Sequence, residues 1–212
     1  MSARPRGVTF DLDGTLYRAR DVHVRFLLRN LLFARTIRVA RAVRDELRAV
    51  ELDDGAHFAR EEAARVAERL DSDAATVRAR LDRLFNEALC RSLAAVGPRP
   101  DARAALQSLV DAGLSIAVVS DYRVPEKLHA LGLDDLPWSA LVAGEEEGAL
   151  KPWPRAFLRA AERMGLAPDA IVHVGDRADT DGEGARRAGM ECLLVDDKRT
   201  LREIARALLD RT

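Results

Sequence analysis

The segment Gly-Val-Thr-Phe-Asp-Leu-Asp-Gly-Thr-Leu-Tyr at residues 7–17 places two acids two positions apart at the end of a short apolar run. Side chains at positions i and i+2 of a strand point to the same side, so Asp11 and Asp13 converge on one small volume. Two carboxylates this close repel each other unless a cation or a shared proton compensates them. The pattern suits a divalent metal, an aspartate nucleophile and an acid–base partner. Taken alone, it also suits an ordinary turn that ends a surface strand.

The composition limits the class of protein. The chain has 212 residues, of which 48% are apolar and 33% charged, and a formal charge of −1. This length predicts one domain or a domain with a smaller insert, and the near-zero charge predicts no nucleic-acid partner. Two distant cysteines make no disulfide framework, no apolar run reaches the roughly 18 residues of a membrane span, and the basic N-terminus enters a strand too early for a signal peptide. These features predict a cytoplasmic protein.

The order of predicted elements divides the chain. Apolar periodicity predicts helices over 21–50, 57–70 and 71–89, and this helical block ends at Val-Gly-Pro-Arg-Pro, residues 96–100. Beyond it, helices and strands alternate. The predicted strands are 114–120, 139–143, 170–175 and 191–195; the predicted helices are 101–112, 124–131, 154–164, one ending near Gly189 and one starting at a Thr200-x-x-Glu203 capping box.

Strands separated by helices imply a parallel sheet with helices on both faces. The lone strand at 8–12 must join this sheet, because it has no other partner. We therefore predict an α/β fold in which residues 1–16 and 98–212 form a Rossmann-like core and residues 17–97 form an inserted all-helical domain.

Chemically useful side chains follow each predicted strand. In open parallel sheets, ligands bind beyond the carboxyl ends of the strands. Mg²⁺ prefers about six oxygen ligands, which Asp11, Asp176 and Asp181 can supply together with the main-chain carbonyl of Asp13. The hydroxyl of Ser120 and the ammonium group of Lys151 suit a phosphate group.

Each of these residues also has an ordinary explanation when taken singly. Ser120 suits a turn, Lys151 precedes a proline in what would be a solvated loop, and Asp176 can cap the following helix. Asp179 is as well placed as Asp181 to be the outer metal ligand. The agreement of four strand ends, in order, favours the functional interpretation.

The same motifs resemble those of a known family. Asp11-Leu-Asp13-Gly-Thr, Val-Val-Ser120-Asp, Leu-Lys151-Pro and Gly-Asp176 followed by Asp181 resemble, in this order, the four motifs of the haloacid dehalogenase (HAD) superfamily. The helical block resembles that superfamily's alpha-helical cap. The resemblance implies a Rossmann-like core, Mg²⁺ as cofactor and an aspartyl-phosphate intermediate.

The resemblance also implies roles for single residues. Asp11 would be the nucleophile and Asp13 the general acid and then base. Ser120 and Lys151 would bind phosphate, and the metal would be held by Asp11, Asp13, Asp176 and Asp181. Because an alkoxide leaving group needs a proton donor and a halide does not, Asp13 favours a phosphatase over a dehalogenase. We predict hydrolysis of a small phosphorylated metabolite; a phosphomutase, or an inactive binding protein that uses the cap, are the alternatives.

Several residues depart from this pattern or stand outside it. Asp121 follows Ser120 where the family often has Asn, and its charge would weaken anion binding unless it points away or pairs with Arg123. Tyr17 is expected to be a packed aromatic and His173 a hydrogen-bonded core histidine. The segment 18–50 is rich in arginine, and a basic amphipathic helix can bind a membrane surface. Because it has few aromatic anchors, we favour a solvated helix face and no membrane partner.

Overall fold

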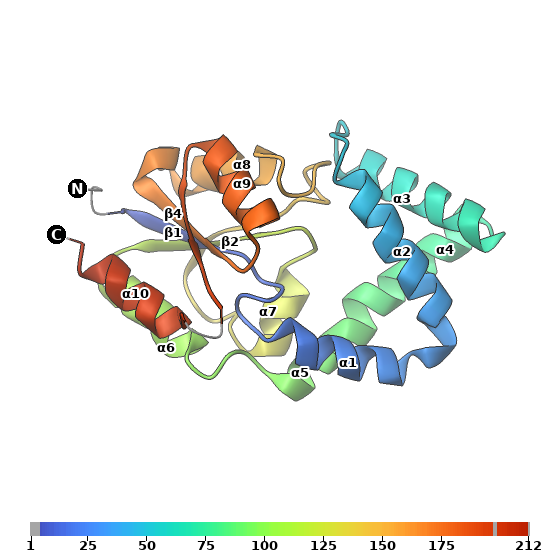
Figure 1. Cartoon of the computed structure of the whole chain (residues 1–212), viewed down its shortest axis with the longest axis horizontal. Helices are drawn as coiled ribbons and strands as arrows, with labels where there is room; N and C mark the ends of the chain where they lie inside the picture. The colour runs from blue at the N-terminus through green and yellow to red at the C-terminus, as the bar shows by residue number, and fades with distance from the viewer. Residues whose placement is uncertain (1–4, 197–198, 212) are drawn as a thin grey trace.

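The computed structural model describes residues 5–196 and 199–211. The two outer ends of the predicted core, 1–4 and 212, and residues 197–198 within it lie outside the described residues. One parallel sheet lies at one end of the molecule and a group of helices at the other (Figure 1). The strands lie in the order β3-β2-β1-β4-β5. Their bounds are β1 Gly7–Phe10, β2 Ser115–Ser120, β3 Trp138–Ala143, β4 Ile171–Gly175 and β5 Glu191–Leu194. The predicted α/β fold with a parallel sheet is confirmed.

The first strand is the centre of the sheet. Gly7 of β1 is in register with Ser115 of β2 on one side and with Ile171 of β4 on the other. Every residue of β1 and β4 is buried, because helices cover both faces, and this explains their continuous apolar runs. Consequently, the loops that follow β1, β2 and β4 leave the sheet side by side at one edge.

Helices cover the two faces of the sheet (Figure 1). Leu106 and Ile204 pack with Val8 on one face, whereas Phe157 and Ala160 pack with Ala117 on the other. The first face carries α6 Ala102–Asp111, α7 Pro125–Leu131 and α10 Leu201–Leu209; the second carries α8 Arg155–Met164 and α9 Glu183–Ala188. The predicted capping box at the start of α10 is present, with Thr200 and Glu203 each accepting the other's backbone N–H.

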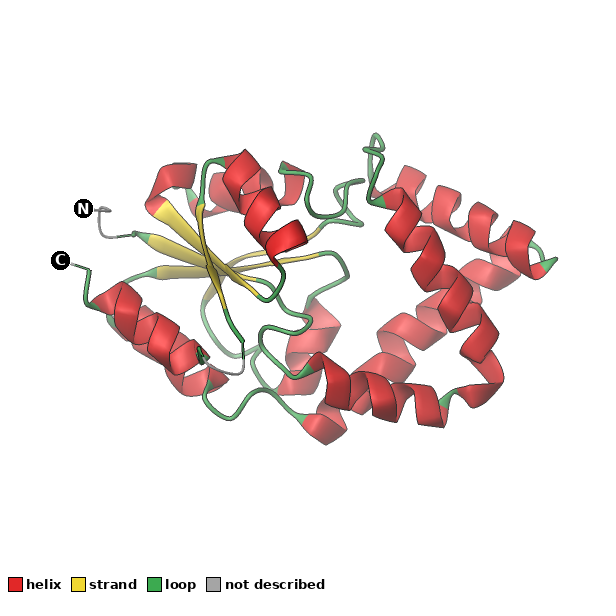
Figure 2. Cartoon of the chain, in the orientation of Figure 1, coloured by secondary structure: helices red, strands yellow, loops and turns green. Residues whose placement is uncertain are grey.

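The helical segment between β1 and α6 forms the other end of the molecule (Figure 2). Val43, Phe58 and Leu81 lie in an apolar cluster of α2, α3 and α4, whereas Phe26 of α1 and Leu93 of α5 join the main core. The elements are α1 Ala19–Arg29, the 3₁₀ turn η1 Leu31–Phe33, α2 Ala34–Leu47, α3 Gly55–Leu70, α4 Ala74–Asp82, the π-type segment η2 Arg83–Ala88 and α5 Leu89–Val96.

The prediction of one helix over 21–50 is wrong, because the chain turns at Asn30. The backbone of Asn30 has φ −127° and ψ 33°, outside the helical region, and its side-chain amide donates to the carbonyl of Phe26 at 2.8 Å. This local hydrogen bond ends α1, as Asn side chains often do. The predicted helix over 71–89 instead continues to Val96. No helix in the described ranges is long and apolar enough to cross a bilayer.

Candidate active site

The predicted site residues meet at the carboxyl edge of the sheet. Asp11 follows β1, Ser120 ends β2, and Asp176 follows β4, while Lys151 lies in the loop after β3. A cavity of about 280 Å³ opens between this edge and the helical segment; it is lined by Asp11, Asp13, Lys151, Asp176 and Asp181 from the sheet side and by His23, Phe26, Arg41, Arg44 and Arg48 from the helical side.

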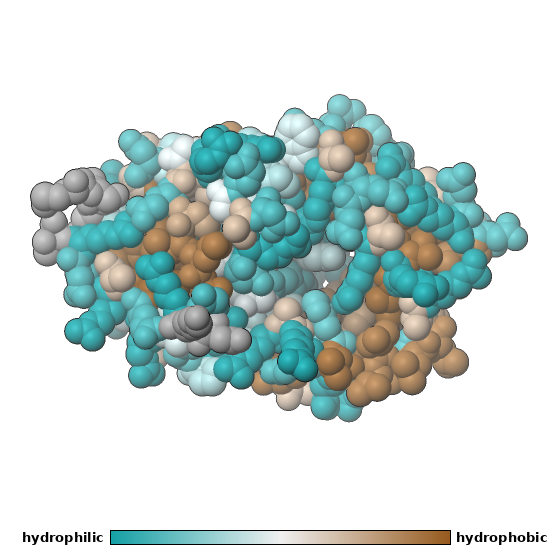
Figure 3. All heavy atoms as spheres, in the orientation of Figure 1, coloured by the Kyte–Doolittle hydropathy of each residue, from teal (hydrophilic) through white to brown (hydrophobic). Residues whose placement is uncertain are grey.

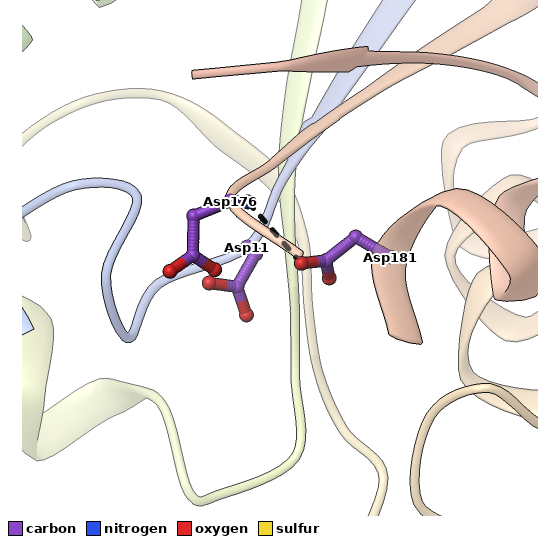
Figure 4. A group of neighbouring side chains, drawn as sticks. All are labelled: Asp11, Asp176 and Asp181. Carbon is purple, nitrogen blue, oxygen red and sulfur yellow. Dashed lines mark hydrogen bonds between the residues drawn. The ribbon is translucent and has the colours of Figure 1, made fainter. Parts of the chain in front are cut away.

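Three carboxylates form the centre of the site. Asp11, Asp176 and Asp181 each offer an oxygen, and these oxygens lie within 4.8 Å of one another. Figure 4 shows the Asp11 and Asp176 side chains beside each other, with Asp181 reaching back to the backbone N–H of Asp176. Gly14, at φ +106°, leaves room for the Asp176 side chain, because a Cβ at residue 14 would lie 2.1 Å from Oδ2 of Asp176.

Asp181, rather than Asp179, belongs to this cluster. Oδ2 of Asp181 accepts the backbone N–H groups of Asp176 and Arg177 at 3.2 and 3.1 Å. Asp179 is exposed and pairs with the Arg177 guanidinium at 2.6 and 3.1 Å. The π-type turn Ala178–Gly182 separates the two directions in which these acids point.

Lys151 is the cation of the cluster. Its buried ammonium lies 2.5 Å from Oδ1 of Asp11 and 2.5 Å from Oδ1 of Asp181. Burial would lower the pKa of Lys151, but the charges of Asp11, Asp181 and Asp121 outweigh it and hold that pKa above its ordinary value. For Asp181, burial raises the pKa, but Lys151 and a hydrogen bond from His173 leave it well below its ordinary value.

The cluster has more negative than positive charge. Three carboxylates face a single ammonium group, and burial, together with Asp181 and Asp13, raises the pKa of Asp11 well above its ordinary value although Lys151 opposes this. Burial, followed by the charge of Asp181, also raises the pKa of Asp176. A divalent cation would compensate this excess, and carboxylate oxygens are the ligands that Mg²⁺ prefers. The donor set therefore fits Mg²⁺; a contribution from the Asp13 carbonyl stays a prediction.

Asp13 lies outside this acid cluster and accepts hydrogen bonds from different residues. Lys127 donates to its two oxygens at 2.6 and 2.7 Å, the hydroxyl of Tyr17 at 2.5 Å, and the hydroxyl of Ser120 at 3.2 Å. Burial would raise the pKa of Asp13, but the Lys127 charge and these hydrogen bonds outweigh it and leave that pKa below its ordinary value. The two acids of one motif thus have different surroundings. Asp11 lies beside two other carboxylates and accepts from Lys151 and Thr15, whereas Asp13 accepts from Lys127, Tyr17 and Ser120.

Lys127 and the hydroxyl of Tyr17 were missed by the motif analysis. Tyr17 is fully buried, as expected for a packed aromatic, but its hydroxyl also contacts Asp13. Lys127 lies in the first turns of α7, and its ammonium also lies 4.5 Å from the centre of the Tyr122 ring. The sequence contained one indication that Lys127 is functional: lysine is rare in this chain and occurs only at positions 127, 151 and 198.

Asp121 does not pair with Arg123, which was one of the two alternatives considered for it. Its Oδ2 lies 2.5 Å from a guanidinium nitrogen of Arg48, and its Oδ1 accepts the backbone N–H of Lys151 at 2.7 Å. Arg123 lies near Glu126 and Glu146 instead. The charge of Asp121 is therefore neutralised from the helical segment, by an arginine 73 residues earlier in the chain.

Two further buried polar side chains near the cavity have identified partners. Arg44 is buried and contacts Glu62 at 2.6 Å and Glu145 at 2.5 Å. His173 is buried and hydrogen-bonded as predicted, to Thr9 at 2.9 Å and to Asp181 at 3.3 Å. His173 therefore has a structural role, because its hydrogen bond orients Asp181.

Comparisons with known proteins find relatives of this chain among phosphatases. A glyceraldehyde 3-phosphate phosphatase of Methanopyrus kandleri is 43% identical over 96 residues, which are 44% of this chain and 41% of that protein. A protein of the same name from Methanocaldococcus jannaschii is 26% identical over 205 residues, 87% of this chain and 82% of that one. The chain thus spans less than half the length of the first relative and most of the second.

Solved structures show the same fold. A 2-haloacid dehalogenase of Pseudomonas syringae superposes with a TM-score of 0.67 at 24% identity, over 98% of this chain and 99% of that one. The model of the family described as haloacid dehalogenase-like hydrolase matches residues 5–189. Because that match covers most of the chain, the protein belongs to the haloacid dehalogenase-like hydrolase family.

Proposed function

We propose that the protein is a Mg²⁺-dependent phosphatase that hydrolyses a phosphate monoester of a small metabolite through an aspartyl-phosphate intermediate. The observation that carries this proposal is the different surroundings of Asp11 and Asp13. Asp11 lies in the acid cluster with Lys151, whereas Asp13 lies among hydrogen-bond donors at the cavity. Two carboxylates with distinct environments can act as nucleophile and acid–base group side by side.

The reaction would proceed in two displacements. The carboxylate of Asp11 attacks phosphorus, the bond to the substrate oxygen breaks, and Asp13 donates a proton to that oxygen. Asp13 then accepts a proton from water, which attacks the aspartyl-phosphate, releases inorganic phosphate and restores Asp11. Bound Mg²⁺ would supply positive charge that stabilises ionised Asp11 and the transferring phosphoryl group.

The hydrogen-bond donors around Asp13 influence whether its carboxyl group is protonated. Ser120 and Lys127 both donate to Asp13 in this structure. A phosphoryl group in the cavity would compete for the same donors, because its oxygens carry more charge than one carboxylate. We infer that substrate binding draws Ser120 and Lys127 away and lets Asp13 hold the proton needed for the first displacement.

The proposed role of residues 17–97 is that of a cap over the cavity. The segment contributes His23, Phe26 and Arg41 to its walls, and a cap that covers the site excludes water from the transfer. A volume of about 280 Å³ suits a small ligand. The names of the two relatives make a phosphorylated three-carbon compound, glyceraldehyde 3-phosphate, the first substrate to test.

The test compares Asp11→Asn with Asp179→Asn, using an aryl phosphate and glyceraldehyde 3-phosphate with and without Mg²⁺. Both changes remove one negative charge, but Asp179 lies outside the acid cluster and pairs with Arg177. We expect Asp11→Asn to abolish release of phosphate and Asp179→Asn to retain it. Asp11→Asn at wild-type rate would show the mechanism to be wrong. Return of the phosphoryl group to a sugar phosphate, instead of release as phosphate, would identify a phosphomutase.

A further inference from the structure

An apolar surface lies at the elbow between α1 and α2. It consists of six exposed side chains, here called the elbow patch: Val24, Leu27, Leu28, Leu31, Leu32 and Phe33. Leu32 is 98% exposed and Leu28 66% exposed. Figure 3 shows hydrophobic atoms gathered at the lower right of the view, where Figure 1 places α1. Elsewhere in the described ranges, Leu158 is the only large apolar side chain with comparable exposure.

The patch lies on a second face of α1 and on the turn that follows it, and it is not an incomplete core. Val22 and Phe26 are the buried residues of this helix and pack into the main core. Val24, Leu27 and Leu28 lie on a different side of α1, which faces solvent, and the exposed side chains of η1 continue the apolar surface beyond Asn30. A helix with apolar side chains on both its inner and outer sides has more apolar surface than folding requires, and contiguous exposed patches mark interaction sites.

Positive charge surrounds the patch. Between Val22 and Val43 the chain has five arginines and no aspartate or glutamate. Arg29, Arg35 and Arg38 are exposed, and none of them pairs with a carboxylate in the described part of the chain. This segment therefore carries a local positive charge on a protein whose formal charge is only −1.

Exposed apolar side chains together with unpaired arginines favour one class of partner. A symmetric contact between two copies would bring the two sets of unpaired arginines together, and like charges oppose such a contact. An anionic lipid surface satisfies both features: leucines enter the boundary between headgroups and acyl chains, and arginines contact phosphates. We propose that the elbow patch docks the protein onto anionic phospholipid membranes. This proposal departs from the expectation of a solvated helix face, because six large apolar side chains of the same segment are exposed.

The proposal defines how binding depends on conditions. Phe33 is the one aromatic side chain of the patch, so apolar insertion is shallow and charge contributes much of the affinity. Each arginine near an anionic surface contributes about 1 kcal/mol, and salt screens this attraction. We therefore expect reversible binding that requires anionic lipid and weakens as ionic strength rises.

The test is sedimentation of the full chain with vesicles of phosphatidylcholine alone or mixed with phosphatidylglycerol. We expect binding only to the mixed vesicles. The double variant Leu28→Ser, Leu32→Ser should bind at least about tenfold less. The double variant Arg29→Glu, Arg38→Glu should bind at least about 30-fold less, the equivalent of two lost arginine contacts.

Matched controls lie on the opposite end of the molecule. Leu158→Ser removes the other exposed large apolar side chain, on α8, and Arg202→Glu reverses an exposed charge on α10. Both should bind as wild type, and thermal unfolding verifies that every variant is folded. Equal binding to neutral vesicles, no binding to mixed vesicles, or an equal loss in the controls would overturn the proposal. So would a lipid-free dimer, seen by analytical ultracentrifugation, that Leu28→Ser dissociates, since a second copy would then occupy the patch.

Discussion

The ammonium group of Lys127 lies 2.6 Å from Oδ1 and 2.7 Å from Oδ2 of Asp13, a residue 114 positions earlier in the chain. Both side chains line the cavity, and Lys127 is buried. The contact holds Asp13 in its ionised form, with help from Tyr17 and Ser120. It therefore links α7, on one face of the sheet, to the acid–base step proposed for Asp13.

Replacing Lys127 with Met should move the pH dependence of the reaction. Without the ammonium group, burial dominates and the pKa of Asp13 rises, so the limb of the pH–rate profile that reports on Asp13 shifts to higher pH. The direction of this shift, to higher pH, is the expected outcome. Profiles of kcat/KM and kcat for wild type and Lys127→Met measure this. Lys127→Arg, which keeps the charge, should restore part of the original profile; an unchanged profile in Lys127→Met would exclude this role.

Motifs predicted which side chains lie close together better than periodicity predicted the bounds of the helices. Asp11, Asp176 and Lys151 could be placed together because parallel strands deliver their carboxyl ends to one edge, whatever the intervening sequence. Lys127 was missed because its contact with Asp13 depends on the packing of α7, which no local motif records. The break at Asn30 was missed because apolar residues on both sides of it keep a helical spacing, and one side-chain hydrogen bond decides the bend.

The choice between Asp179 and Asp181 illustrates the same limit. Both follow Asp176 at spacings that suit a ligand or a helix cap. The π-type turn decides which side chain faces inward, and such turns have no strong sequence signature. The contact between Asp121 and Arg48 could not be predicted for the same reason, because it joins the helical segment to the sheet edge.

Mg²⁺ should stabilise the folded protein, and the effect should depend on Asp176. A ligand that binds only the folded state at 100 times its Kd adds about 2.7 kcal/mol to the free energy of unfolding. The wild type should therefore show a rise in Tm on addition of Mg²⁺ after treatment with a chelator. Asp176→Asn, which removes one oxygen donor of the cluster, should lose most of that rise.

Asp179→Asn is the matched control for Asp176→Asn, because it removes the same charge from an exposed residue that pairs with Arg177. Calorimetry or thermal unfolding monitored by circular dichroism measures the shift without any assay of activity. The same rise in Asp176→Asn as in the wild type would remove Asp176 from the proposed ligands.

His173 should make stability fall under mildly acidic conditions. Burial is the main cause that lowers the pKa of His173 below its ordinary 6.5, although Asp181 opposes it. Above pH 6.5 both folded and unfolded states hold neutral imidazole, so His173 contributes no pH dependence. As the pH falls below that value, the unfolded state binds the proton first, and the free energy of unfolding decreases by up to about 1.4 kcal/mol per pH unit.

The comparison of wild type with His173→Gln isolates this contribution. Urea denaturation between about pH 8 and about pH 5.5 gives the slope for each protein, and the acids of the cluster are common to both. We expect the wild type to lose more stability than the variant as the pH falls. Parallel slopes would mean that the buried imidazole takes up its proton as readily as an unfolded one.

Removing the charge of Arg48 and removing the charge of Asp121 should change KM in opposite directions. Arg48 neutralises Asp121, which follows Ser120 in the chain and whose carboxylate accepts the backbone N–H of Lys151. Removing the guanidinium in Arg48→Met leaves this charge uncompensated next to the proposed phosphate site, so KM should rise, by about fivefold for roughly 1 kcal/mol of repulsion.

The double variant Arg48→Met, Asp121→Asn separates charge from packing. The amide oxygen of Asn can still accept the backbone N–H of Lys151, but the negative charge is gone, so KM should return most of the way to the wild-type value. Asp121→Asn alone frees the Arg48 guanidinium and should lower KM. If the double variant keeps the raised KM of Arg48→Met, then Arg48 acts by holding the helical segment against the sheet edge, through its second hydrogen bond to the Lys151 carbonyl at 2.9 Å, and not by neutralising Asp121.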